Sequence, residues 1–144
     1  MRPLEEHLMR RLTIVGLIVA AGMIWGCVPQ QTTSKESVEK ESQAHYQVGV
    51  QYLSEGKSGQ ALQELTAAQA LTPGNADIEH ALGLAYQHKG LYDKAIEHYK
   101  KALELTPKLT EARNNLGTVH LAKGEYQEAI RLFEECVKDP LYST

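Results

Sequence analysis

The middle of the chain contains two consecutive segments in which apolar side chains recur at spacings of three and four. The apolar positions are Ile78, Leu82, Ala85 and Tyr86, then Ala95, Ile96, Tyr99, Ala102 and Leu103. This spacing gathers apolar side chains on one face of a helix, so it predicts two amphipathic helices. Gly90 between them supplies a positive φ where the first helix ends, and Pro107 ends the second helix. The pattern therefore predicts a helix-turn-helix unit.

This unit occurs three times at a period of 34 residues. The landmarks of the middle copy are Leu82, Gly83, Tyr86, Gly90, Ala95, Tyr99, Ala102 and Pro107. Their upstream counterparts are Val48, Gly49, Tyr52, Gly56, Ala61, Leu65, Ala68 and Pro73. Downstream they are Leu116, Gly117, His120, Gly124, Ala129, Phe133 and Cys136, with the last proline one residue early at Pro140.

The three copies occupy residues 42–75, 76–109 and 110–143. They predict helices near residues 41–54, 58–71, 76–88, 92–105, 110–122 and 126–138, antiparallel within each pair, and no β-strand between residues 42 and 138. A single pair cannot bury its apolar face alone, so the copies are expected to stack around one continuous core.

Small and polar residues refine this prediction. Gly83 and Ala95 carry almost no side chain, so the paired helices can approach closely there. Ser58, Asn75 and Thr110 stand where helices begin and are predicted N-caps.

The order G-x-x-Y, then A-x-x-x-(aromatic or Leu)-x-x-A, then Pro, at this period, resembles the tetratricopeptide repeat (TPR). The Trp common at the fourth position of that repeat is replaced by His45, Glu79 and Arg113. The resemblance implies an all-α, right-handed superhelical array whose concave face, lined by the first helix of each pair, binds a partner.

By the same resemblance, positions 2, 5, 9 and 12 of the first helices line the concave face. These positions hold Gln43, Tyr46, Val50 and Leu53; Asp77, His80, Leu84 and Gln87; and Glu111, Asn114, Thr118 and Leu121. The lysines that clamp a C-terminal carboxylate in chaperone-binding TPR proteins are absent. The aliphatic members form an apolar strip edged by polar groups, which suits an amphipathic helix or an extended apolar segment. The alternative is that one or two of them belong to the core.

The composition, with 42% hydrophobic and 23% charged residues in 144, is that of an ordinary folded protein. The formal net charge is −3 and no basic stripe is present, so nucleic acid is excluded as a partner.

The first 26 residues have the features of a secretory signal peptide: Arg2, Arg10 and Arg11, then an apolar run that ends at Gly26. The sequence Ile24-Trp25-Gly26-Cys27 resembles the bacterial lipobox, which implies cleavage before Cys27 and its lipidation. By resemblance to enterobacterial sorting, Val28 favours the outer membrane. Met9 is an alternative start, and a simple transmembrane anchor is the alternative interpretation of the segment.

Residues 27–41 are polar, lack apolar periodicity and are predicted to form a flexible tether, with residues 28–36 lacking fixed structure. The alternative for the part from about Ser37 is that it already forms the first turn of the first helix.

Catalytic and metal-binding constellations are not found. Cys136 occupies the small-residue position of its copy and is predicted to be a buried, inert thiol. Asp77 and His80 could supply two metal ligands from one helix face, but no third ligand has matching spacing. His120 replaces a tyrosine of the other copies and is predicted to be a packing ring. The sequence predicts no enzyme activity, no cofactor and no metal site.

The segments AHYQVGVQYLSEG and KDPLY, together with the lipobox, resemble the type IV pilus biogenesis/stability lipoproteins (the PilF/PilW pilotin family). This resemblance implies an outer-membrane-anchored protein, facing the periplasm, that binds secretin subunits and assists their assembly and localisation. Family members carry more repeats, so the chain would correspond to their N-terminal half.

Two alternatives remain: a general TPR scaffold of the cell envelope, and the TPR part of a truncated larger protein. Ile130, Phe133 and Val137 are expected to be partly uncovered at the end of the third copy, which indicates either truncation or coverage by a partner.

Overall fold

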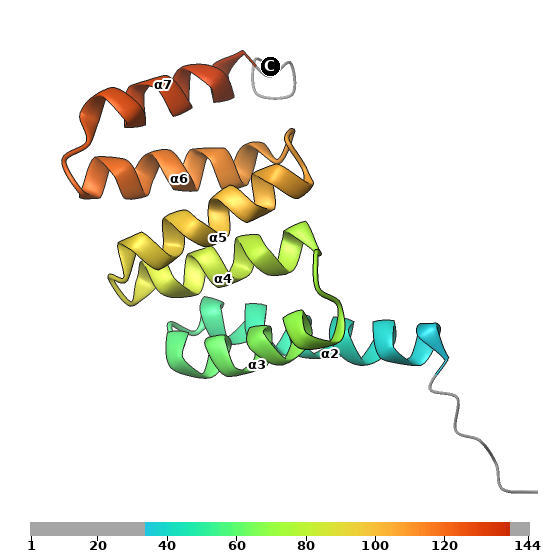
Figure 1. Cartoon of the computed structure of the whole chain (residues 1–144). Helices are drawn as coiled ribbons and strands as arrows, with labels where there is room; N and C mark the ends of the chain where they lie inside the picture. Colours follow the sequence, from blue (N-terminus) through green and yellow to red (C-terminus); the bar gives the residue numbers. More distant parts are fainter. Residues whose placement is uncertain (1–33, 139–144) are drawn as a thin grey trace, which may run out of the picture. The chain divides into compact units, whose positions relative to one another are not determined.

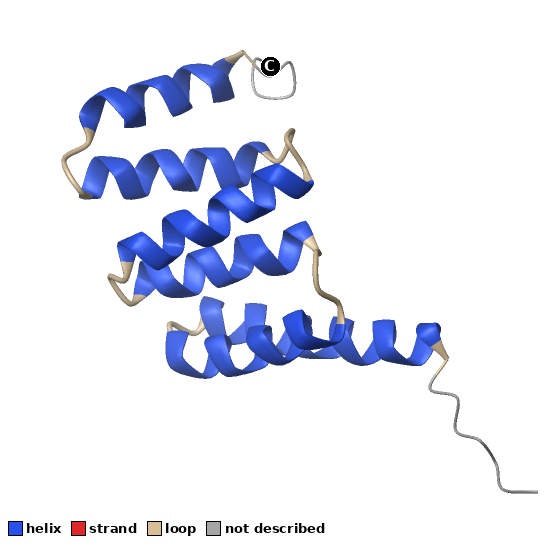
Figure 2. Ribbon diagram, in the orientation of Figure 1, coloured by secondary structure: helices blue, strands red, loops and turns tan. Residues whose placement is uncertain are grey.

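A computed structural model describes residues 34–138, and every regular element in this range is an α-helix. The helices are α2 (Lys35–Ser54), α3 (Ser58–Leu71), α4 (Ala76–His88), α5 (Tyr92–Leu105), α6 (Thr110–Ala122) and α7 (Tyr126–Val137) (Figures 1 and 2). The predicted six helices are confirmed, and four of them have the predicted bounds. No β-strand occurs in the described range, as expected.

The helices pack as three antiparallel pairs, α2 with α3, α4 with α5, and α6 with α7, and each pair stacks on the next. Contacts also join α2 to α4 and α4 to α6, whereas no contact joins α3 to α5 or α5 to α7. Among the described helices, the first members of the pairs therefore lie closer together than the second members. The first helices form the inner layer of the stack.

Glycines set the distance between the two helices of each pair. A Cβ atom on Gly83 would lie 2.5 Å from Cε1 of Tyr99, and one on Gly117 would lie 2.7 Å from Cε1 of Phe133. In the first pair, a Cβ on Gly49 would lie 2.7 Å from Cγ of Leu65. Each glycine therefore receives a large side chain of the facing helix, which confirms the predicted close approach at Gly83.

The apolar core is continuous across the stack. Ala61, Leu65 and Ala68 of α3 pack with residues of α4, while Ala95, Tyr99 and Ala102 of α5 pack with residues of α6. Leu84 of α4 contacts both groups and joins them. This arrangement is the shared core that the repeated pattern predicts.

Ion pairs fill the place of the missing tryptophan. In the first pair His45 Nδ1 lies 2.7 Å from a carboxylate oxygen of Glu64, and in the second Glu79 lies 2.7 Å from Nδ1 of His98. The residues occupy equivalent positions with acid and base exchanged. In the third pair Arg113 Nε lies 3.3 Å from a carboxylate oxygen of Glu135. The sequence pattern did not reveal these partners.

The start of α2 differs from the prediction. The helix begins at Lys35, so residues 35 and 36, predicted to lack fixed structure, are helical. Residues 37–41 are also helical, which agrees with the alternative of a first turn from about Ser37. Ser34 caps the helix by accepting a hydrogen bond from the backbone N–H of Ser37, and Glu36 pairs with Lys40 one turn later. Residues 1–33, which hold the predicted signal peptide, Cys27 and the first part of the tether, lie outside the described residues.

Two of the three predicted N-caps are wrong. Asn75 caps α4 by accepting from the N–H groups of Asp77 and Ile78, as predicted. The cap positions of α3 and α6 are instead Lys57 and Leu109, which make Ser58 and Thr110 the first helical residues. Neither Lys57 nor Leu109 makes a side-chain capping hydrogen bond.

Candidate functional site

The predicted groove residues lie on the three inner-layer helices, and their exposure divides them into three groups. Val50, Asn114, Thr118 and Leu121 are exposed, Tyr46, His80, Leu84 and Gln87 are half-buried, and Leu53 is buried. Leu53 packs in the core with residues of α3 and α4, so it offers little surface to a partner. We therefore remove it from the candidate groove; the burial of this position depends on the neighbouring helices and not on its spacing.

The accessible apolar positions are Val50 on α2, Leu84 on α4 and Leu121 on α6. Val50 is 39% exposed and Leu121 is 49% exposed. Leu84 is half-buried because one side of it joins the two core groups. One aliphatic side chain from each inner helix thus remains accessible, and these three residues define the apolar strip below.

Polar groups beside the strip already have partners within the protein. The hydroxyl of Tyr99 donates to Oε1 of Gln87 at 2.6 Å, and the hydroxyl of Thr118 donates to the backbone carbonyl of Asn114 at 3.0 Å. The side chains of Gln87 and Thr118 are therefore already hydrogen-bonded within the protein. Recognition by the strip is expected to rest mainly on apolar contact.

His80 connects two inner helices. Its Nε2 lies 2.9 Å from the side-chain nitrogen of Asn115 on α6, and its ring lies 5.8 Å from the ring of Tyr99. Burial lowers the pKa of His80, although Glu111 and Asp77 act in the opposite direction. A neutral ring can accept a hydrogen bond from the Asn115 amide. Asn115 was missed by the sequence analysis because the other copies hold Gln47 and Ala81 there.

Two acids give the groove a negative edge. Asp77 and Glu111 are exposed in the first turns of α4 and α6, where negative charge also favours the helix dipole. Asp77 acts on two groove rings: it helps burial to raise the pKa of Tyr46, and it opposes the lowering of the pKa of His80. Glu111 acts on His80 in the same direction. The two carboxylates therefore place negative charge beside the rings of Tyr46 and His80.

The structure brings no metal-ligand set together in residues 34–138: no group of three His, Cys, Asp or Glu side chains is suitably placed there. Cys136 is buried, as predicted, and its thiol lies 3.8 Å from the backbone carbonyl of Thr110. His120 is a buried ring that pairs with Glu125 through Nδ1, which agrees with its predicted packing role. None of the described helices combines the length and the apolarity needed to span a bilayer.

Comparison with protein families identifies the repeats. Residues 74–138 match the model of the tetratricopeptide repeat. This segment is therefore similar to the tetratricopeptide repeat. The first helix pair lies before the matched segment but has an equivalent close contact between its helices, in which Gly49 faces Leu65 instead of an aromatic ring. No curated protein matches the chain.

Several solved structures are similar. The second TPR of Spaghetti (RPAP3) bound to the HSP90 peptide SRMEEVD is 23% identical, with a TM-score of 0.65 over 69% of this chain and 92% of that one. PilF of Pseudomonas aeruginosa is 30% identical, with a TM-score of 0.67 over 73% of this chain and 47% of that one. MamA of Desulfovibrio magneticus RS-1 is 29% identical, with a TM-score of 0.64 over 67% of this chain and 54% of that one. The chain thus spans about half of PilF and MamA.

Proposed function

We propose that the protein is a TPR scaffold that binds an apolar segment of a partner protein along the inner layer of its helices. TPR arrays are protein-interaction scaffolds, and the Spaghetti repeat holds a peptide. The observation that carries the proposal is the apolar strip: Val50 and Leu121 stay exposed at inner positions, where solvation alone would favour polar residues.

The negative edge of the groove selects among apolar segments. Asp77 and Glu111 would attract a partner with a Lys or Arg beside its apolar residues and would repel an acidic one. The HSP90 peptide SRMEEVD, which the Spaghetti repeat binds, is acidic at its end. The ligand of this chain is therefore expected to be apolar and basic, unlike that peptide.

In the cell, we propose that the scaffold is anchored to the outer membrane through a lipidated Cys27, faces the periplasm and assists a type IV pilus secretin. The support is the lipobox-like sequence before Cys27, the KDPLY segment and the likeness to PilF. Labelled palmitate should enter the wild type and not Cys27→Ser; equal labelling would remove the anchor from the proposal. A general envelope scaffold would share the groove but would not co-purify with a secretin.

The groove is tested by Val50→Glu with Leu121→Glu, because both side chains are exposed and the substitutions should leave the fold intact. Losing two apolar contacts should weaken partner binding at least tenfold, by the usual value of about 1.5 to 3 kcal/mol for each buried side chain. Co-purification of the secretin with each variant is the measurement. Val48→Glu is the matched control, since Val48 is 40% exposed on α2 but outside the strip. A folded double variant that retains the secretin would show that the groove is not the binding surface.

A further inference from the structure

His80 lies in the inner groove at the joint between the second and third repeats. It stands one turn before Leu84 on α4, and its Nε2 lies 2.9 Å from the side-chain nitrogen of Asn115 on α6. Its ring also lies 5.8 Å from the ring of Tyr99 on α5. The hydroxyl of Tyr99 already donates to Gln87, so the partner that the described residues give to Nε2 is the Asn115 amide.

This hydrogen bond depends on the protonation state of the ring. The amide nitrogen of Asn115 can only donate, so Nε2 of His80 accepts and carries no hydrogen. The ring is then neutral, with its hydrogen on Nδ1. A protonated ring donates from both nitrogens, so a donor would face a donor across 2.9 Å. Proton uptake therefore requires the Asn115 amide to turn over and offer its oxygen to the Nε2 hydrogen.

Proton uptake also changes the charge of the groove. Burial lowers the pKa of His80, whereas Glu111 of α6 and Asp77 of its own helix act in the opposite direction. The phenols nearby are neutral at physiological pH, because burial and then Asp77 raise the pKa of Tyr46 on α2, and burial raises that of Tyr99. The ring thus lies among two carboxylates and two uncharged phenols. A proton on it offsets part of the negative charge of the carboxylates.

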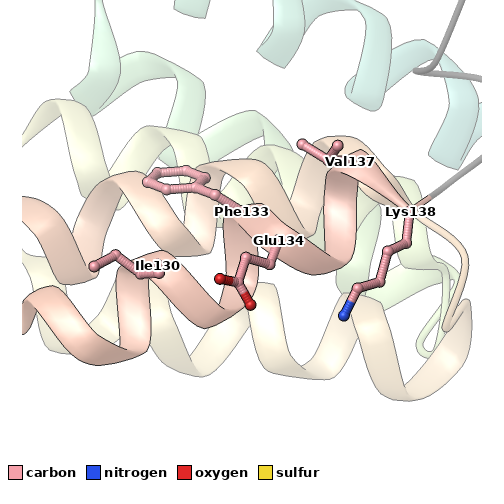
Figure 3. A pocket seen from close by; sticks show the side chains of 5 residues that line it. All are labelled: Ile130, Phe133, Glu134, Val137 and Lys138. Atoms are coloured by element: carbon pink, nitrogen blue, oxygen red, sulfur yellow. The ribbon is translucent and has the colours of Figure 1, made fainter.

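The outer face of α7 is apolar as well but lacks such a ring. Ile130 is 57% exposed and Val137 is 71% exposed, and with Phe133, Glu134 and Lys138 they line an open hollow of about 410 Å³. Figure 3 shows that all five side chains come from one helix. No histidine is among them. This face therefore serves as a control surface for the inner groove.

We propose that His80 is a pH-sensitive switch of the inner groove: the neutral ring, held by Asn115, permits binding of a partner segment with a basic flank, and the protonated ring releases it. The positive ring would repel the basic flank and offset its attraction to Asp77 and Glu111. By linkage, a bound cationic segment opposes proton uptake as much as the proton opposes binding. The partner in this inference rests on the proposed function, whereas the reversal of the hydrogen bond does not.

The reversal is tested without a partner. NMR of the full chain follows the ring of His80 and the side-chain amide of Asn115 from about pH 8 to about pH 5. Both signals should change with one midpoint, and the Asn115 signal should stay constant in His80→Gln. Asn115→Asp places a carboxylate at the ring, so it should move the His80 midpoint to higher pH. An Asn115 signal that does not follow the titration of His80, or a midpoint that Asn115→Asp leaves in place, would overturn the proposal.

Release is tested with the purified secretin subunit as the probe, at about pH 7.5 and about pH 5. The wild type should bind about threefold or more weakly at the lower pH, because repulsion by the ring is then added. The ratio of the two affinities should be near one in His80→Gln, whatever its affinity at the higher pH. Ile130→Gln with Val137→Gln, on the outer face of α7, should keep the wild-type ratio.

Equal ratios in the wild type and His80→Gln would overturn the switch and leave the proposed function in place. Absence of secretin binding at both pH values would overturn the proposed function and the switch together. A pH dependence that the α7 variant abolishes would place the probe on the outer face and would also overturn the switch. Circular dichroism at both pH values checks that the variants fold, and His80→Asn replaces His80→Gln if the latter unfolds.

Discussion

At the scale of single residues, each helix pair depends on a glycine that leaves room for a large side chain of the facing helix. Gly83 leaves room for the ring of Tyr99, which is fully buried and donates its hydroxyl hydrogen to Gln87. The aromatic ring rests where any Cβ would intrude, so the glycine and the ring act as one packing unit. Gly59 on α3 is different, because nothing lies within 4 Å of its missing Cβ.

Gly83→Ala and Gly59→Ala should therefore change the free energy of unfolding in opposite directions. The first should lower the free energy of unfolding by about 1 to 3 kcal/mol through overpacking against Tyr99. The second should raise it by up to about 1 kcal/mol, because alanine is the better helix former and meets no neighbour. Urea unfolding measures both. Equal effects would contradict the role assigned to the close contact.

His80 makes stability depend on pH. Burial lowers its pKa in the folded state below the ordinary value of 6.5, so the unfolded chain takes up the proton first as pH falls. The free energy of unfolding should therefore decrease as pH drops below about 6.5 and should level off below the folded-state pKa. His80→Gln removes the titrating group, so its stability should fall less over the same range. An identical pH dependence in the two proteins would show that His80 does not contribute.

At the scale of elements, the exchanged ion pairs connect helices and repeats. The side chains of Glu79 and His98 are 7% and 13% exposed, and Glu79 also accepts a hydrogen bond from Gln69 of the preceding repeat. His98 stacks on Tyr86 with ring centroids 5.1 Å apart. The hydrogen-bonded pair thus occupies a crowded interior position that in many TPR sequences holds a tryptophan.

The two orientations of the Glu–His pair can be tested by exchanging Glu79 and His98. Glu79→His alone should destabilise the protein by about 1 to 3 kcal/mol, because His98 and Gln69 then lose the carboxylate to which they are hydrogen-bonded. Adding His98→Glu should recover part of that loss, since the first repeat holds the same pair in that order as His45 and Glu64. A double-mutant cycle by chemical unfolding measures the coupling. A double variant no more stable than Glu79→His would show that the pair contributes nothing as a pair.

At the scale of the whole described stack, each helix pair contacts only its neighbours. Stability in such arrays is a sum of local and nearest-neighbour contributions. The middle pair, α4 and α5, is covered on both sides, whereas α7 has one apolar face exposed. The two ends also differ from each other, because the outer face of α2 carries Gln47 and Gln51.

Amide hydrogen exchange should follow this order. Amides of α7 should exchange faster than those of α4 and α5, because opening α7 uncovers little additional surface. Mass spectrometry of the intact fold, with peptides resolved by helix, gives the comparison. Protection of α7 equal to that of α4 would mean that its outer face is covered in solution.

The sequence by itself determined the helices, because their limits depend on local signals. Apolar spacing, Gly90 at a positive φ of 70° and the Asn75 cap act within a few residues, and the 34-residue period repeats them. The early start of α2 is also local, since Ser34 and Glu36 are ordinary start signals. The predicted lipidation at Cys27 stays a prediction, because it lies outside the described residues.

Only the tertiary structure decided which surfaces are free. Leu53 and Leu121 share a position in the repeat, yet the first is buried and the second is 49% exposed. The hydrogen bond between His80 and Asn115 joins residues 35 positions apart, and the ion pairs of His45 and Glu79 each span 19 positions. Spacing within one helix determines the direction in which a side chain points. Whether that side chain is buried or paired depends on which residues of the neighbouring helices lie opposite it. The 34-residue period predicts where each side chain points, and the stacking of the helix pairs determines which residues it contacts.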